Sequence, residues 1–265
     1  RNFKYIYIDS YKYKKSNKIK RIISWLDFER RLFLLKKNNL TKPDVIIVSS
    51  LSILTIINGF ILKKKYSCKL FFEIRDIWPL TLVEEGGFSN KNIFILFLKF
   101  VEFIGYKYSD HIIGTMPNLK EHVRNTLGYE KKVSCIPIGF SNEEIIKGKE
   151  ISNKIKTIIP KNKFIVGYFG AIGISNGLNC FFDSINNLKE KRDIHFIIAG
   201  DGDLKNYYFK NTKGFENITF LPMIEKVYIH SLMSNCDLLY FSTKNSKVWK
   251  FGQSLNKLVD YMLTG

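Results

Sequence analysis

The stretch Phe164-Ile-Val-Gly-Tyr-Phe-Gly-Ala-Ile-Gly-Ile-Ser-Asn-Gly177 joins an apolar run to a glycine-rich turn. Apolar residues then return at helical spacing, at Leu178, Phe181, Phe182, Ile185 and Leu188. A strand, a turn and a helix in this order are typical of a parallel α/β sheet. Gly170, Gly173 and Gly177 leave backbone N–H groups uncovered, and the positive end of the following helix attracts anions. The turn therefore predicts a phosphate site. It lacks the G-x-G-x-x-G and P-loop patterns, so a plain strand–helix connection is the alternative.

The same alternation of strands and helices extends in both directions along the chain. Strand-like runs lie at 45–48, 70–74, 111–114, 133–136, 195–199, 218–221 and 238–241, and residues 3–8 also alternate like a strand. Helical patterns lie at 17–38, 51–64, 91–107 and 117–127, and from Ser254 onward. We predict an α/β fold of two doubly wound domains, at residues 1–145 and 146–265, joined by a polar, lysine-rich linker over 139–163. Both domains are expected to be truncated, because these patterns reach both ends of the chain and the first residue is not Met.

The charge of the chain is strongly positive. Its 265 residues include 42 Lys and Arg against 24 Asp and Glu, a formal net charge of +18. Such an excess favours anionic partners: nucleic acid, acidic lipid or diphosphate-bearing substrates. The lysines are spread along the whole chain, so a lysine-rich composition is the competing explanation. We find no helix-turn-helix signature and no basic motif interleaved with aromatics, which argues against nucleic acid.

The potential metal ligands are dispersed. Four cysteines and four histidines show no pair at zinc or redox spacing. The sequence therefore predicts no metal site and no cofactor, and its cysteine usage fits a reducing, cytoplasmic compartment.

No run of residues reaches the roughly 18 uninterrupted apolar positions that span a bilayer. The segment Ile93–Ile104 is apolar around most of its circumference, is interrupted by Lys99 and Glu102, and is flanked by Lys91 and Lys107. A deeply buried helix is one interpretation. The other is a helix whose apolar face enters an anionic membrane surface, with lysines at headgroup level.

The last helix of the second half carries polar groups in its first turns. With Ser254 as its N-cap, Asn256 and Lys257 fall in the first turn. A cation there opposes the helix dipole unless an anion lies nearby, which favours Lys257 as a phosphate ligand. Asp260 lies one turn deeper on the same face and could accept hydrogen bonds from ribose hydroxyls. A solvated Lys–Asp pair is the alternative.

Two other strand ends carry candidate site residues. Ala199-Gly-Asp-Gly202 follows a strand of the second half, where Gly200 and Gly202 let a loop pass close to a ligand. Arg75 and Asp76 follow a strand of the first half, and the carboxyl ends of parallel strands face the ligand cleft in open α/β sheets. Asp76 could orient an acceptor hydroxyl and Arg75 could bind a phosphate bidentately, or the two could form a structural ion pair. Trp78 offers a face for sugar stacking, or belongs to the core.

Four motifs in this order resemble the family-4 retaining glycosyltransferases, which have the two-Rossmann-domain GT-B fold. They are Phe72-Glu-Ile-Arg-Asp-Ile-Trp-Pro79, the 170–177 loop, Ala199-Gly-Asp-Gly202 and Asn256-Lys-Leu-Val-Asp-Tyr-Met262. Lys42-Pro-Asp44 and Ile136-Pro-Ile-Gly139 extend the likeness over nearly the whole chain. The subgroup it most resembles builds bacterial O-antigen, capsule and exopolysaccharide chains and includes N-acetyl-fucosamine transferases.

This resemblance implies retaining transfer of a hexosyl or N-acetylhexosaminyl group from a nucleotide sugar, expected to be a UDP-sugar, in surface polysaccharide biosynthesis. The second domain would hold the donor through Gly170, Gly173, Gly177, Gly200, Gly202, Asn256, Lys257 and Asp260. The first would hold a lipid-linked or polysaccharide acceptor through Arg75, Asp76 and Trp78. Asp76 and Lys257 are the predicted catalytic residues. The enzyme is expected to be cytoplasmic and peripheral on the inner face of the cell membrane.

The chain departs from the pattern of that family at two places. The first acidic residue of the family's paired-glutamate motif falls at about Phe251 or Gly252, and Asp260 replaces the second. The family's Arg/Lys pair falls near Ala171 and Asn176. A non-catalytic relative acting as a scaffold, or an inactive fragment, is therefore the alternative function.

Overall fold

The computed structural model describes all of the chain except residues 1–4, 13–17, 36–40, 51, 141–147 and 265. The chain divides into two compact units. The first comprises Arg1–Pro137 and Ser246–Gln253, and the second comprises Ile138–Asn245 and Ser254–Gly265. The domain boundary predicted between residues 145 and 146 lies outside the described residues.

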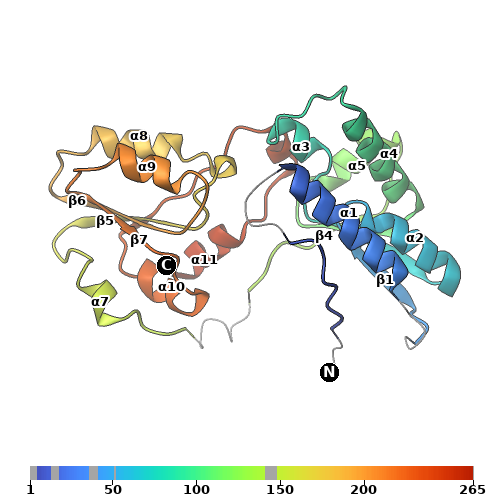
Figure 1. Cartoon of the computed structure of the whole chain (residues 1–265), viewed down its shortest axis with the longest axis horizontal. Coiled ribbons are helices and arrows are strands. Elements are labelled where there is room, and N and C mark those ends of the chain that lie inside the picture. The colour runs from blue at the N-terminus through green and yellow to red at the C-terminus, as the bar shows by residue number, and fades with distance from the viewer. Residues whose placement is uncertain (1–4, 13–17, 36–40, 51, 141–147, 265) are drawn as a thin grey trace. The chain divides into compact units, whose positions relative to one another are not determined.

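The first unit is built on a parallel sheet with the strand order β1-β2-β3-β4 (Figure 1). Its strands are β1 (Val45–Ser49), β2 (Lys69–Ile74), β3 (His111–Gly114) and β4 (Val133–Cys135). Its helices are α1 (Lys18–Leu34), α2 (Thr55–Tyr66), α3 (Leu80–Glu84), α4 (Ile93–Tyr108) and α5 (Leu119–Leu127), with the short helix η2 (Lys247–Phe251). Alternate strand residues such as Leu70, Phe72 and Ile112 are fully buried, because they pack in one core with residues of α2, α4 and α5.

The second unit is built on another parallel sheet, with the strand order β7-β6-β5-β8. Its strands are β5 (Phe164–Phe169), β6 (Ile194–Ala199), β7 (Ile218–Leu221) and β8 (Leu238–Leu239). Its helices are α7 (Asn153–Lys156), η1 (Ile174–Asn176), α8 (Asn179–Asn187), α9 (Lys205–Asn211), α10 (Lys226–Met233) and α11 (Asn256–Thr264). Tyr168 packs with α8 and α9, whereas Phe169, the next residue of β5, packs with α10 and α11. Helices therefore cover both faces of this sheet (Figure 1).

The structure confirms the α/β class and the parallel strands read from the sequence, and β5 begins and ends where predicted. Two local expectations were wrong. Residues 5–8 form no strand. The segment expected to be a linker also belongs in part to the second unit, because Ile151 is buried in its core and Lys149 donates a backbone hydrogen bond to Val227 (2.7 Å). Ile151, Ile155 and Ile159 are therefore packing residues of this unit.

The segment 246–253 returns from the second unit to the first, which the sequence analysis did not anticipate. Phe251 is 2% exposed and lies in the core of the first unit. Its ring meets the imidazole of His122 edge to face at 5.0 Å, and its carbonyl accepts the backbone N–H of Asn118 (2.9 Å). Lys250 pairs with Glu121 at 3.5 Å.

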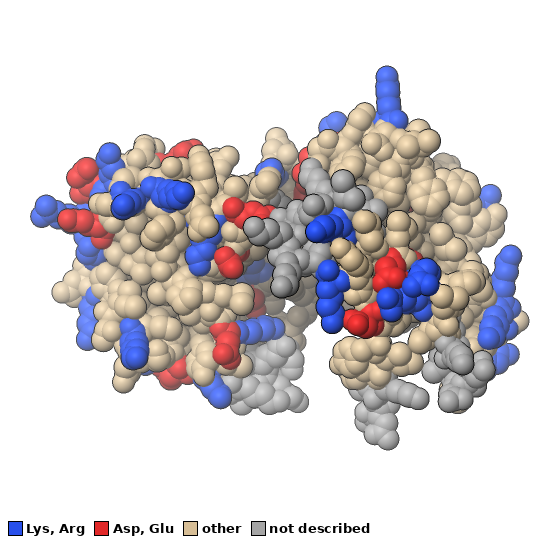
Figure 2. Space-filling model, viewed as in Figure 1, with Lys and Arg blue, Asp and Glu red and all other residues tan. Residues whose placement is uncertain are grey.

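Charged side chains are distributed over the surface in both signs. On the face shown in Figure 2, Lys and Arg are scattered among Asp and Glu and do not gather in one continuous patch. This distribution agrees with the even spread of lysines along the sequence.

Candidate functional site

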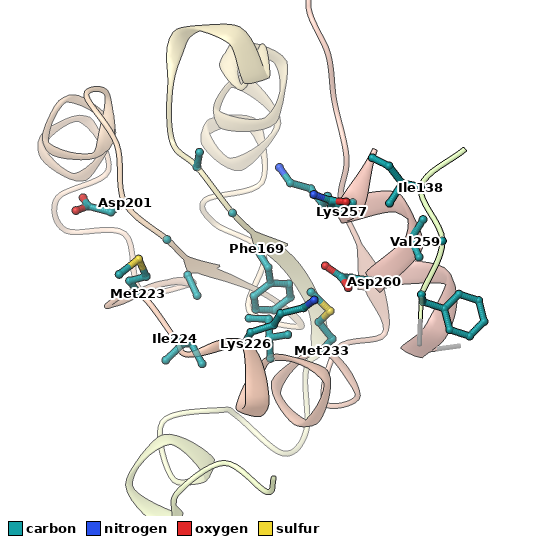
Figure 3. A pocket seen from close by; sticks show the side chains of 18 residues that line it. Ile138, Phe169, Asp201, Met223, Ile224, Lys226, Met233, Lys257, Val259 and Asp260 are labelled. Atoms are coloured by element: carbon teal, nitrogen blue, oxygen red, sulfur yellow. The ribbon is translucent and has the colours of Figure 1, made fainter. Parts of the chain in front are cut away.

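A pocket of about 580 Å³ opens at the carboxyl edge of the β5–β6–β7 sheet, entirely within the second unit. Three strand ends contribute to it: Phe169 to Ala171 at the end of β5, Ala199 to Asp201 at the end of β6, and Met223 with Ile224 in the segment after β7. Figure 3 shows α10 and α11 around it, with Lys226 and Met233 on α10 and Lys257 and Asp260 on α11. The sequence order strand, loop, helix thus places loop backbone and helix residues around one hollow, as open parallel sheets do.

The loops after β5 and β6 are joined by backbone hydrogen bonds. The N–H of Gly170 donates to Ala199 (3.0 Å), and the N–H of Ile172 donates to Asp201 (2.8 Å). A Cβ at Gly200 would overlap the carbonyl oxygen of Gly170, and a Cβ at Gly202 would overlap that of Ile172. Only glycine permits two backbones to approach so closely. The Gly200–Gly202 turn therefore serves loop-to-loop contact, a role the sequence analysis did not assign.

Lys257 lies in the first turn of α11, as predicted, and lines the pocket. Its ammonium donates a hydrogen bond to the Tyr168 hydroxyl (2.8 Å) and lies 4.1 Å from the centre of that ring. Its side chain also lies against Gly170, where a Cβ would come within 2.8 Å of the lysine Cε. Burial lowers the pKa of the Lys257 ammonium to about 8. Among the described residues no carboxylate forms an ion pair with it.

Ser254 does not cap α11, contrary to prediction. Its hydroxyl accepts the backbone N–H of Ile138 (2.7 Å), and the first helical hydrogen bond, from Val259, reaches the carbonyl of Leu255 instead (3.2 Å). The helix begins one residue later than a Ser254 cap would require. Ser254 instead holds the chain at Ile138 beside the pocket, which Ile138 and Phe140 line.

Asn256 and Asp260 also line the pocket. The Asp260 carboxylate lies 4.0 Å from Nε2 of His230, a residue of α10, so α10 and α11 contact each other through this pair as well. The predicted donor residues Gly170, Gly200, Asn256, Lys257 and Asp260 are thus brought together at one pocket.

Three other predicted donor residues do not line the pocket: Gly173, Gly177 and Gly202. Gly177 has a φ of 59°, and a Cβ there would come within 3.0 Å of the backbone of Thr243 and Lys244. Ser242 donates a hydrogen bond to the carbonyl of Asn176 (2.9 Å). The distal part of the 170–177 loop is therefore packed against the segment after β8, and Gly177 permits that contact, whereas a Cβ at Gly173 would meet nothing closer than 3.8 Å.

The predicted acceptor residues lie in the first unit after β2. Arg75 and Asp76 are exposed, and Ser50 anchors the turn by accepting the Arg75 backbone N–H (3.0 Å). Trp78 is 9% exposed and packs edge to face against Trp25 at 5.3 Å within the core. This burial contradicts a role for Trp78 as an open stacking platform and favours the alternative, a core residue.

Within the part of the chain that the structure describes, no three His, Cys, Asp or Glu side chains are grouped so that they could hold a metal ion. The charged groups that line the pocket come from three places in the fold: Asp201 follows β6, Lys226 lies on α10, and Lys257 and Asp260 lie on α11.

The pocket combines a cationic edge with an apolar interior. Phe169, Ile224, Ile229, Met233 and Val259 supply the apolar surface. Lys257 supplies positive charge beside backbone of the 170–171 loop, and the amino end of α11 adds its dipole. A ligand with a flat apolar ring at one end and phosphates at the other matches these two halves.

Sequence reasoning missed the contribution of α10. Lys226 is the first residue of that helix and lines the pocket. It shows the same signal that identified Lys257, a cation in the first turn of a helix. Ile229 and Met233 follow Lys226 at helical spacing and could have been found with it.

The two four-stranded parallel sheets define a protein of two Rossmann-like domains, matching the domains of the GT-B fold. Structures that share this fold with the chain include HepE from Anabaena in complex with UDP, at 16% identity and a TM-score of 0.59 over 93% of this chain and 63% of HepE. Sucrose-phosphate synthase from Thermosynechococcus elongatus is 12% identical, with a TM-score of 0.61 over 84% of this chain and 56% of the synthase. A UDP-N-acetylglucosamine 2-epimerase is 10% identical, with a TM-score of 0.50 over 81% of this chain and 55% of the epimerase.

These similarities establish the fold alone. The reaction has to be inferred from the residues of the pocket. The chain spans about three fifths of the length of the HepE structures it matches. No family model and no curated protein matches the sequence.

Proposed function

We propose that the protein is a glycosyltransferase that binds a UDP-sugar in the pocket of the second unit. It transfers the sugar, with retention, to a lipid-linked or polysaccharide acceptor in surface polysaccharide biosynthesis. The observation that carries the proposal is Lys257, a half-buried ammonium that lines a nucleotide-sized pocket and forms no ion pair with a carboxylate among the described residues. HepE, a protein of the same fold, has been solved with UDP and with UDP-glucose, which supports the choice of donor.

The pocket supplies what departure of a diphosphate requires. In the transfer, the bond between the anomeric carbon and the diphosphate oxygen breaks, and its electron pair leaves with the diphosphate. Lys257 and the amino end of α11 stabilise the negative charge that develops there. The acceptor oxygen bonds to the anomeric carbon on the face just vacated, and its proton passes to the departing phosphate oxygen. Asp76 and Arg75, exposed in the first unit, are proposed to orient the acceptor and bind its phosphate.

The proposal is tested by calorimetry with UDP, uridine and a UDP-sugar panel, each with magnesium and with EDTA. UDP is expected to bind more tightly than uridine, because the cationic edge recognises phosphate, and EDTA is expected to change nothing. Equal binding of UDP and uridine would remove the phosphate site from the pocket. A magnesium requirement would overturn the metal-free part of the proposal.

One observation favours the non-catalytic alternative. Phe251, near where the resemblance to retaining glycosyltransferases expects an acidic residue, is buried in the core of the first unit and cannot contact a donor sugar. The protein would then bind a nucleotide sugar without transferring it. Chromatography of a UDP-sugar incubated with an acceptor extract distinguishes the two functions, since only transfer releases UDP in step with acceptor labelling.

We further propose that α4 attaches the protein to an anionic membrane, the inner face of the cell membrane. No helix in the described part of the chain is long and apolar enough to cross a membrane. Along α4, however, Ile93, Leu96, Phe97 and Phe100 recur at helical spacing and are exposed, the last by 61%. Lys99 and Lys107, also exposed, can lie at headgroup level.

Replacing Phe97 and Phe100 of α4 with aspartate should strongly reduce binding to vesicles that contain acidic lipid. Each change removes an apolar anchor and adds a charge that anionic headgroups repel. Co-sedimentation at increasing salt measures the effect, and wild-type binding should fall with salt. Phe209→Asp, at an exposed phenylalanine of α9 in the other unit, is the matched control. If wild-type protein ignores acidic vesicles at low salt, α4 is not a membrane anchor.

A further inference from the structure

Tyr168 occupies an unusual position for a fully buried residue. It lies in β5 with 0% exposure, yet its hydroxyl contacts two residues that line the pocket. That hydroxyl accepts a hydrogen bond from the Lys257 ammonium (2.8 Å) and donates one to the carbonyl of Ala171 (2.6 Å), a pocket residue. One side chain therefore connects the cation of α11 to the loop after β5.

The Tyr168 hydroxyl holds the lysine without neutralising it. Burial raises the pKa of the phenol far above the neutral range, so Tyr168 remains uncharged and keeps its proton for Ala171. The ammonium therefore retains its full charge toward an arriving anion. A carboxylate acceptor at the place of the Tyr168 hydroxyl would instead cancel the charge that a phosphate needs.

The contact also restricts where Lys257 can point. A free lysine side chain loses rotamer entropy when it becomes ordered on a ligand. Here the ammonium lies over the aromatic ring and its stem lies against Gly170, where a side chain would collide with it. The cost of ordering is therefore met in the folded protein before any ligand arrives.

We propose that Tyr168 is a positioning residue, which fixes the Lys257 ammonium and the Ala171 backbone as one pre-formed anion-binding edge of the pocket. The inference deepens the proposed function, because the anion it serves there is the diphosphate of the donor. The ordering of Lys257 by Tyr168 can nevertheless be measured without any ligand.

The first test follows Lys257 in ligand-free protein. NMR of ¹³Cε-labelled lysine gives the titration midpoint of Lys257, with its resonance assigned by Lys257→Arg. Tyr168→Phe keeps the ring and the packing but removes the oxygen that accepts from the ammonium. The midpoint should fall below that of the wild type, since the charged form loses its hydrogen-bond acceptor. The other titratable groups that line the pocket, Asp201, Lys226 and Asp260, are unchanged in this variant.

The second test follows binding by calorimetry. Tyr168→Phe should weaken UDP binding about tenfold and leave uridine binding unchanged, because uridine has no phosphate for Lys257. Tyr208→Phe is the matched control: Tyr208 is also buried, but its hydroxyl donates to Asn179 (2.7 Å), which does not line the pocket. A purely structural role for Tyr168 would weaken both ligands alike and leave the Lys257 midpoint in place.

An unchanged Lys257 midpoint in Tyr168→Phe overturns the inference, whatever the binding data show. A lowered midpoint together with no UDP binding by the wild type would leave the positioning role standing and refute the nucleotide-sugar function instead. The two failures are therefore distinguishable.

Discussion

Lys257→Ala is expected to weaken UDP binding by about 1–3 kcal/mol, a range that runs from an ordinary hydrogen bond to one made by a charged group. The ammonium is the cation placed at the first turn of α11 against the 170–171 loop, so its removal takes away charge that no adjacent group of that helix turn replaces. Calorimetry against UDP measures the loss. Lys210→Ala, at an exposed position of α9 outside the pocket, should bind as the wild type does.

The same residue predicts a pH dependence. Burial depresses the pKa of Lys257 to about 8, so the ammonium is charged below that pH and becomes neutral above it. UDP affinity should therefore be fully present near pH 7 and fall as the pH rises through about 8 to 9, and this fall should be absent in Lys257→Ala. Equal affinity of the wild type and Lys257→Ala at pH 7 would refute the assignment of Lys257 to the diphosphate.

Gly200→Ala is expected to destabilise the second unit by about 3 kcal/mol, the upper end for overpacking. The added methyl group would overlap the carbonyl oxygen of Gly170, a backbone atom that cannot rotate away. The loops after β5 and β6 would have to separate, which breaks the hydrogen bond from Gly170 to Ala199 and deforms the pocket. UDP binding should fall together with stability.

The positions of the tryptophans allow the loss of stability in Gly200→Ala to be assigned to one unit. Trp25, Trp78 and Trp249, the three in the sequence, all belong to the first unit. Urea unfolding followed by tryptophan fluorescence should therefore be unchanged in Gly200→Ala, while circular dichroism should show an earlier transition. Gly173→Ala is the control from the neighbouring loop, since a Cβ there meets nothing closer than 3.8 Å. A Gly200→Ala protein as stable as the wild type would mean that the two loops are not held in contact.

Much of the fold could be predicted because the strands of a buried parallel sheet appear in the sequence as continuous apolar runs. Phe164–Phe169 is such a run, and its bounds were found without error. The segment 246–253 could not be found in this way. Val248 and Phe251 look like ordinary helix residues, and only the tertiary structure shows that they complete the core of the other unit. The strand predicted near the start of the chain was wrong for the opposite reason. Residues 5–8 alternate like a strand in sequence, but no strand forms there.

The site residues also differ in whether their roles could be predicted from local sequence. Lys257 could be predicted because its conflict with the helix dipole is a local property of the sequence. The hydrogen bond of the Ser254 hydroxyl could not be predicted in this way. Its donor is the backbone N–H of Ile138, which lies far away in the sequence. Glycine positions were recognised as special, but their partners were not: Gly200 and Gly177 face other backbone segments, which local pattern cannot specify.

The return of Ser246–Gln253 to the first unit has a consequence for how the protein is made. The amino-terminal part of a chain generally folds first as it leaves the ribosome. Here the core of the first unit lacks Val248 and Phe251 until residues Ile138–Asn245 of the second unit have been synthesised. A nascent chain that stops at Asn245 would expose the unfilled surface around His122, where Phe251 belongs, and would also lack α11. The core of the first unit therefore closes only after this late stretch of polypeptide has been made, and a fragment ending at Pro137 would lack part of that core.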